Sequence, residues 1–289
     1  MDRRQHRKAG VGGTVAAMLM LVGPGVCATG CAVGGAAAED GHGAPDPVAV
    51  LHRAADTLRS AGSSRARTSM EMATGGTRVT ISGTGVYDYR RRLGQLTVVL
   101  PQDPAGATEH RPITELLAPG ALYMKNRGAG VPADKWVRVD TATLSDGNLV
   151  TGGATDPYAA AELLRGTRTA TYAGRTEVDG VAVRHYRGTA DLAEAAGAAS
   201  AGDRAALASA AKGFATAEVP FDAYLDDQGR IRKLQQRFSF VNGQQQAPVA
   251  VTSTTLLSGF GTPVEVTLPH PEDIYAGRIA ENQPRGAGQ

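Results

Sequence analysis

The sequence predicts an α+β fold in which one large, curved antiparallel sheet of about ten or eleven strands carries helices on its concave face. Most of the chain after residue 62 alternates apolar and polar residues with a period of two, which is typical of strands with one buried face. Turn-forming pairs such as Pro119-Gly120 and Asp179-Gly180 separate neighbouring segments, which predicts hairpins. The helical segments are few and short, and an antiparallel sheet of this size is expected to twist and curl around them.

In the first half of the chain, Asp46-Pro47 predicts the start of a helix. Asp caps free N–H groups there, and Pro has no N–H to leave unpaired. An apolar stripe at helical spacing follows as far as Gly62. The strands predicted after this helix are 68–74, 77–89, 93–100, 111–117, 121–126 and 135–139.

In the second half, Asp156-Pro157 repeats the capped start and predicts a short helix over 158–164. The Ala-rich segment 192–214 predicts one broken helix or two helices, divided near Gly202. The strands predicted in this half are 168–177, 181–189, 215–225, 230–241, 248–259 and 264–268.

Composition excludes several classes of protein. The chain has 289 residues, of which 42% are hydrophobic, and this share argues against wholesale disorder. A mean hydropathy of −0.20 argues against a polytopic membrane protein. The net charge of +2 gives no reason to expect a nucleic-acid partner.

The first thirty residues are typical of a secretory signal peptide. A basic start is followed by an apolar run over 11–26 that is too short and too interrupted to span a bilayer. Ala28-Thr29-Gly30-Cys31 resembles the lipobox of bacterial lipoproteins, which implies a diacylglycerol group on the Cys31 sulfur. Cys27 remains the alternative modified residue, and the choice between general and twin-arginine export stays open.

The mature chain is interpreted as one domain between two flexible segments. Residues 31–45 are small, Gly-rich and polar, which predicts a tether between the lipid and the domain. The patterned region 46–275 contains no further Gly/Pro-rich linker and is interpreted as a single domain, and 276–289 as a flexible tail. Both cysteines precede the domain, so a disulfide or a Cys-ligated metal is not expected inside it.

The order of these features resembles a known family. The lipobox, the tether, the Pro-started helix, the strand meander and a hairpin over 219–229 with an Asp-x-x-Gly turn are similar to the mycobacterial lipoproteins LppX, LprA, LprF and LprG. A more distant resemblance is to the LolA and LolB lipoprotein carriers. The resemblance to these proteins covers about residues 46–275 and includes no catalytic signature. It implies a half-barrel whose concave face, roofed by helices, holds lipid chains.

We therefore expect a monomeric lipoprotein, anchored through Cys31 at the extracytoplasmic face of the cell membrane. It would bind a lipid or glycolipid in an apolar cavity and pass it to a membrane transporter or another acceptor protein. No catalysis, cofactor, metal or nucleic acid is expected. The candidate cavity-lining residues, which equally fit a packed core, are Val79, Ile81, Leu96, Val98, Leu100, Leu122, Phe221, Leu234, Phe238 and Phe240.

Two other functions remain open from the sequence. The same fold with a filled concave face would suit an envelope sensory or protein-interaction module. Ser209 and Lys212 match the loose Ser-x-x-Lys motif of penicillin-binding enzymes, although the sequence has neither Ser-Asp-Asn nor Lys-Thr-Gly. The histidines are scattered without the spacing of a metal site, at His52, His110, His185 and His270.

Overall fold

The computed structural model describes residues 45–74, 77–101, 111–128, 130–241 and 248–276, which all belong to one compact unit. Eleven strands form one antiparallel sheet in the order β6-β5-β4-β3-β2-β1-β11-β10-β9-β8-β7. Neighbours in the sheet are consecutive in sequence except β1 and β11, whose pairing joins its two halves. The prediction of a single large antiparallel sheet with a few helices is therefore confirmed.

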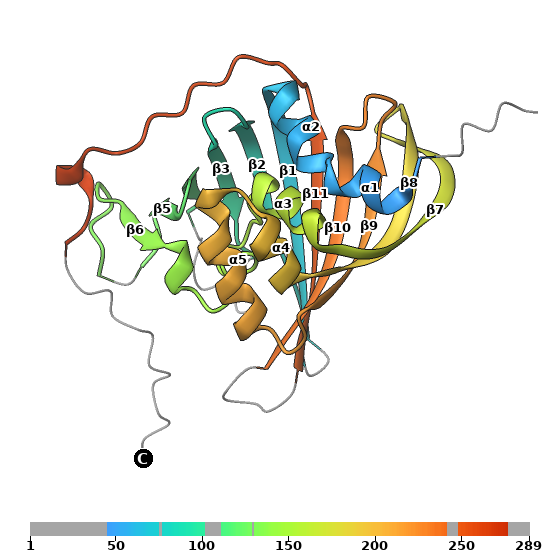
Figure 1. The fold of residues 1–289 in the computed structure, drawn as a ribbon. Coiled ribbons are helices and arrows are strands. Elements are labelled where there is room, and N and C mark those ends of the chain that lie inside the picture. Colours follow the sequence, from blue (N-terminus) through green and yellow to red (C-terminus); the bar gives the residue numbers. More distant parts are fainter. Residues whose placement is uncertain (1–44, 75–76, 102–110, 129, 242–247, 277–289) are drawn as a thin grey trace, which may run out of the picture. The chain divides into compact units, whose positions relative to one another are not determined.

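The strands are β1 Ser63–Thr74, β2 Thr77–Asp88, β3 Leu93–Val99, β4 Ile113–Ala118, β5 Ala121–Lys125, β6 Val137–Asp140, β7 Thr167–Val178, β8 Val181–Asp191, β9 Glu218–Leu225, β10 Ile231–Val241 and β11 Pro248–Ser258. The helices are α1 Pro47–His52, α2 Ala54–Ala61, α3 Pro157–Leu163, α4 Leu192–Ala198 and α5 Ala201–Gly213. Figure 1 shows these helices lying over one face of the sheet. Within the described residues, none of them has the length and apolar character needed to cross a bilayer.

The helix boundaries follow the capping residues. Asp46 and Asp156 each accept hydrogen bonds from the first two free N–H groups of their helices, and each is followed by Pro. Both predicted starts are confirmed. The first helix is interrupted at Arg53, which divides it into α1 and α2. The Ala-rich segment also forms two helices, which are divided at Ala199 and Ser200, close to the predicted position.

The predicted strand at 264–268 is wrong, because residues 263–270 are not part of the sheet. β11 already pairs with β1 on one side and β10 on the other, so the chain leaving β11 meets no free edge. It instead continues toward the distant edge strand β6, and Ile274 pairs in an isolated parallel bridge with Trp136, the residue before β6. The alternation of apolar and polar residues alone does not reveal that both sides of β11 are already paired with other strands.

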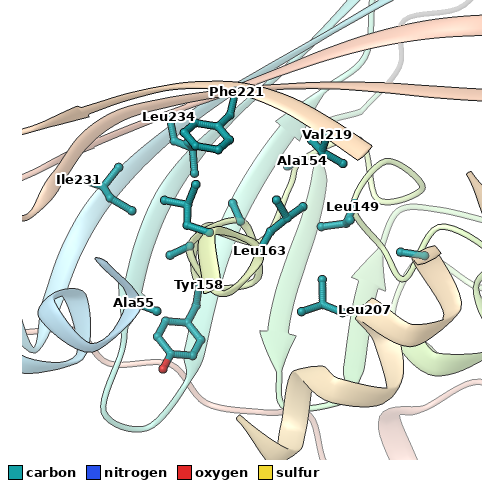
Figure 2. Packing of buried hydrophobic residues seen from close by; sticks show 14 of the residues in the cluster. Ala55, Leu149, Ala154, Tyr158, Leu163, Leu207, Val219, Phe221, Ile231 and Leu234 are labelled. Carbon is teal, nitrogen blue, oxygen red and sulfur yellow. The ribbon is translucent and has the colours of Figure 1, made fainter. Parts of the chain in front are cut away.

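The core lies between the sheet and the helices. In β3, buried and exposed residues alternate, as expected for a strand with one face against a core. Figure 2 shows Phe221 of β9 and Leu234 of β10 directed toward Leu163 of α3. The Gln236 side chain of β10 also donates to the Ala160 carbonyl of α3 at 3.1 Å. These contacts attach α3 directly to the concave face.

Candidate functional site

One region of the concave face is not filled by side chains. A cleft of about 630 Å³ lies between β1, β2, the end of β3, the start of β4, β10 and the segment 150–153. A second hollow of about 140 Å³ adjoins it, shares Val150, Thr151 and Phe240 with it, and reaches Phe214 after α5. The cleft is lined by Met72, Ile81, Leu100, Ile113, Asn126, Arg127, Gly128, Val150, Thr151, Gly153 and Phe240.

The apolar wall of the cleft comes from the strand period. Ile81 lies on the same face of β2 as buried Tyr87, and Ile113 lies on the same face of β4 as buried Leu117. Ile113 is opposite Val98 of β3, so apolar side chains of neighbouring strands meet on this face. The sheet therefore presents hydrocarbon to the cleft.

The opposite wall is a segment held by side-chain hydrogen bonds. The Asp146 carboxylate accepts from the backbone N–H of Val150 at 2.8 Å and from the Thr151 hydroxyl at 2.9 Å. Arg127 donates to the Thr151 carbonyl at 3.3 Å. Gly153 has φ +85°, and a side chain there would press on Ile81. Small residues in a fixed loop thus leave room where a helix with large side chains would fill the space.

A buried acid lies directly behind this wall. Glu115 of β4 has 0% exposure, and neither of its carboxyl oxygens has a hydrogen-bond partner among the described residues. Burial raises the pKa of this carboxyl to about 8, although the charge of Arg127 acts in the opposite direction. The Asn148 side-chain oxygen, close to the same point, is also unpartnered within the described residues. Neither Glu115 nor Asn148 lines the cleft, so the acid is a buried group beside the cleft, and its raised pKa keeps the carboxyl protonated at neutral pH.

The ten candidate residues from the sequence fall into two groups. Ile81, Leu100 and Phe240 line the cleft. Those three also lie in or against the packed hydrophobic cluster, as do the seven that do not line the cleft: Val79, Leu96, Val98, Leu122, Phe221, Leu234 and Phe238. That any of the ten contacts a ligand stays a prediction.

Sequence reasoning missed several residues of the cleft. Met72, Ile113 and Val150 are apolar positions like many others, so nothing singles them out before the fold is known. Glu115 did carry a signal, since it is a lone acid at an inward position of the strand between Ile113 and Leu117. Arg127 follows β5 and had no recognisable pattern.

The other sequence candidates are involved in structural contacts. The Ser209 hydroxyl of α5 donates to the Ala142 carbonyl at 2.6 Å, and Lys212 is exposed. His52 lies 3.0 Å from the Thr167 carbonyl and His185 lies 2.7 Å from Asp222. No group of three metal-ligating side chains occurs in the part of the chain that the structure describes. Cys27, Cys31 and His110 lie outside the described residues, so lipidation stays a prediction.

The opposite face of the sheet carries a second buried acid with a different environment. Asp222 of β9 is 3% exposed and accepts from His185 at 2.7 Å, Arg187 at 3.0 Å and Arg237 at 2.8 Å. Burial disfavours its charge, but hydrogen bonds from Arg237, His185 and Arg187 outweigh burial and lower its pKa to about 2. This cluster is internally satisfied.

Comparison with known proteins yields structural similarity alone. No family model matches the sequence, and no curated protein matches it. Among solved structures, Mycobacterium tuberculosis lipoprotein LppX has a TM-score of 0.44 at 10% identity, with coverage of 76% of this chain and 97% of LppX. LprF of Mycobacterium bovis has a TM-score of 0.38 at 16% identity, with coverage of 79% and 98%.

A LolA-superfamily protein of Nitrosomonas europaea has a TM-score of 0.34 at 9% identity, with coverage of 75% of this chain and 95% of that protein. These are the kinds of protein that the sequence resembles. With TM-scores below 0.5, however, function has to be inferred from the residues of this chain's own cleft.

Proposed function

We propose that this protein binds the acyl chains of a lipid or a lipidated molecule in the cleft and carries it within the cell envelope, without covalent chemistry. The proposal includes anchoring through a lipid on Cys31 at the extracytoplasmic face of the membrane. The acceptor would be another membrane or a protein that takes over the lipid.

The cleft is the observation that supports this proposal. Its volume of about 630 Å³ lies within the usual range for small-molecule sites, roughly 300–1,000 Å³. Hydrocarbon side chains from β1, β2, β4 and β10 and from Leu100 after β3 form one wall, and polar groups are concentrated around Arg127 and Thr151. An amphiphile fits such a site, because its chains meet the apolar wall while its polar part meets the loop.

The free energy of hydration explains why such a protein is useful. Each methylene group moved from water into an apolar site gains about 0.8 kcal/mol. A chain of roughly sixteen carbons therefore gains on the order of 12 kcal/mol from complete shielding. A lipid crossing an aqueous compartment alone would lose this stabilisation, whereas one bound in the cleft would keep part of it.

The experiment compares two tryptophan substitutions at adjacent residues. Leu100 is partly buried and lines the cleft, whereas its neighbour Val99 is 51% exposed. Leu100→Trp places an indole in the cleft, and Val99→Trp adds the same group outside it. The full-length proteins are purified from the cell envelope, extracted with organic solvent and analysed by lipid mass spectrometry.

We expect lipid to co-purify with the wild type and with Val99→Trp, and at least about tenfold less with Leu100→Trp, since steric exclusion of the chain costs more than 1.4 kcal/mol. The lipid on Cys31 is covalent, so it stays attached to the protein during extraction, and intact-protein mass spectrometry measures it separately from the bound lipid. Equal lipid on both variants would show that the cleft is not the binding site, and a lipid-free wild type that also binds no added lipid would reject the proposal.

A further inference from the structure

The end of the sheet that lies away from the cleft carries several exposed arginines. β1 begins at this end, β2 and β11 finish there, and α2 leads into β1 through Gly62. Figure 1 shows α2 at the upper end of β1. Arg65 is near the start of β1, whereas Met72 of the same strand lines the cleft. Their separation along the strand corresponds to about 23 Å.

Two of these arginines belong to the turn between β2 and β3. The Asp88 carboxylate accepts from the backbone N–H groups of Arg90 and Arg91, both at 2.9 Å, which fixes the conformation of the turn. Both arginine side chains are exposed. The third arginine of the run is directed elsewhere, because Arg92 pairs with Asp203 of α5. The turn therefore presents two guanidinium groups to solvent.

Two further arginines come from the neighbouring elements. The guanidinium carbon of Arg90 lies 3.5 Å from the point that a side-chain carbon on Gly62 would occupy. Gly62 ends α2, and Arg59 is in the last turn of that helix. Arg65 of β1 is opposite Val86, near the end of β2. Both Arg59 and Arg65 are exposed, so four exposed arginines lie at the same end of the sheet.

Few acids offset these charges in the described part of the chain. Asp88 is half-buried in the turn, and Glu265 is an exposed acid in the segment that leaves β11. Other acids near this end are in ion pairs within the domain: Asp56 with Arg165, Asp226 with Arg230, and Asp227 with Arg175. When Asp88 and Glu265 are counted against the four arginines, two net positive charges remain.

This charge is complementary to a surface that carries phosphate groups. A guanidinium group donates two parallel hydrogen bonds to a phosphate, and basic residues gathered on one surface are attracted to anionic lipids. The proposed anchor keeps such a surface within reach, because residues 31–45 connect Cys31 to α1 and extend to at most about 50 Å. An anchored domain meets the headgroups of its own membrane continually, which favours the membrane over an acidic protein as the partner.

We propose that Arg59, Arg65, Arg90 and Arg91, here called the arginine end, dock on the anionic phospholipid headgroups of the membrane that anchors the protein. The cleft lies toward the opposite ends of β1 and β10, so docking directs the cleft away from this membrane and toward an acceptor. This proposal rests on the Cys31 anchor of the proposed function and does not depend on what the cleft binds.

The first experiment uses the full-length protein, purified from the cell envelope and inserted through its anchor into preformed vesicles. The vesicles contain phosphatidylcholine alone or phosphatidylcholine with phosphatidylglycerol. The water-soluble reagent p-hydroxyphenylglyoxal modifies exposed arginines, and peptide mass spectrometry measures the rate at each one. Arg78 at the opposite end of β2 is 74% exposed and provides a control within the same molecule.

Two net charges near an anionic surface favour the docked state about thirtyfold at low ionic strength. We therefore expect Arg90 and Arg91 to react at least about fivefold more slowly on the anionic vesicles than on the neutral ones. Arg78 should react equally on both, and high salt should remove the protection of Arg90 and Arg91. Equal protection of Arg78 would show that the vesicle surface shields the whole domain and would overturn the proposal.

A pair of double variants tests whether the charge itself is responsible. Arg90→Gln/Arg91→Gln removes two charges from the arginine end, and Arg78→Gln/Lys212→Gln removes two exposed charges elsewhere. Arg65 reports docking in both proteins. We expect Arg65 to lose its protection in the first variant and to keep it in the second. All four side chains are exposed, so both variants are expected to fold.

The outcomes separate docking from the proposed function. Equal rates at Arg90 and Arg91 on the two kinds of vesicle overturn docking and leave lipid binding in the cleft standing, since the co-purified lipid tests that separately. Protection in native membranes but not on protein-free anionic vesicles would assign the arginine end to an acidic protein and also overturn the proposal. An intact mass without lipid on Cys31 rejects the anchor and docking with it.

Discussion

Two regions of the same concave face have different packing. Under α3, Phe221, Leu234 and Leu163 are almost completely buried and contact one another across the sheet–helix interface (Figure 2). At the cleft, Leu100 and Phe240 remain partly exposed although they occupy equivalent inward positions. The comparison shows that the covering element, and not the strand pattern, decides whether an inward side chain becomes core or cavity wall.

The covering elements explain the difference in chemical terms. α3 places Tyr158 and Leu163 over the sheet, and large side chains fill the space to the density of a protein interior. The cleft is covered instead by the segment that includes Gly152 and Gly153, which has little volume to contribute. In the described part of the chain, the five short α-helices are thus too few to cover the whole concave face of the eleven-stranded sheet.

The two buried acids extend the comparison to polar groups. Asp222 is surrounded by Arg187, Arg237 and His185, which stabilise its charge. Glu115 has almost the same burial and no partner among the described residues. Burial alone therefore does not determine the state of a carboxyl group, because its neighbours decide the direction in which the pKa moves.

The largest expected effect contrasts one phenylalanine from each region. Phe221→Ala should lower the free energy of unfolding by about 3–5 kcal/mol, because it leaves a cavity in a filled core. Phe240→Ala should cost about 1–2 kcal/mol, since its ring already borders an open cleft. Urea denaturation of the full-length proteins measures both values. Equal losses would show that the two regions are packed alike.

The second prediction concerns Glu115 and pH. The carboxyl ionises near pH 4.5 when unfolded and near 8 when folded, so the unfolded state releases its proton first and stability falls as pH rises between these values. Glu115→Gln removes this dependence. Its advantage over the wild type should therefore grow from about pH 5 to pH 8 and reach on the order of 3 kcal/mol.

Chemical denaturation across that pH range tests the difference between the two proteins. Because both proteins contain every other titratable group, their difference isolates Glu115. A difference that does not change with pH would mean that folding does not raise the pKa of Glu115, which would contradict the contrast with Asp222.

The contribution of Asp222 to stability should depend on pH in the opposite direction. Its pKa is about 2 in the folded protein against 3.8 for the free group, so its stabilisation is present above pH 4 and is lost as pH falls toward 2. Asp222→Asn should therefore cost about 2 kcal/mol at pH 7 and little at pH 2. Thermal or urea unfolding at the two pH values measures this. An equal cost at both pH values would indicate that the substitution removes packing contacts and not ion pairs.

The smallest expected effect concerns Ser209, which ties α5 to the Ala142 carbonyl. Ser209→Ala should lower the free energy of unfolding by about 1 kcal/mol through the loss of one hydrogen bond and should leave lipid binding unchanged. Urea denaturation measures the free energy of unfolding, and mass spectrometry of the co-purified lipid measures lipid binding. Labelling of the wild type by a fluorescent penicillin that Ser209→Ala abolishes would contradict this structural role and support the enzyme alternative.

Much of the fold could be predicted because it depends on local rules. The Asp-Pro pairs at 46–47 and 156–157 begin helices, and Asp179-Gly180 forms a hairpin turn with positive φ at both residues. The segment 264–268 was wrongly predicted as a strand, because its alternation is genuine but the edges near it are occupied. Strand pairing depends on partners far away in the sequence, which a local pattern does not contain.

The sequence by itself determined which side of each strand faces inward, because the strand period depends on the backbone alone. It did not distinguish Leu96 in the packed core from Leu100 at the cleft, although both belong to the same strand pattern. Only the tertiary structure decided this. It brings a glycine-containing segment from about fifty residues away to the cleft at Leu100, whereas Leu96 is covered by large side chains. Whether a hydrophobic residue is covered is a property of the neighbours that the fold supplies.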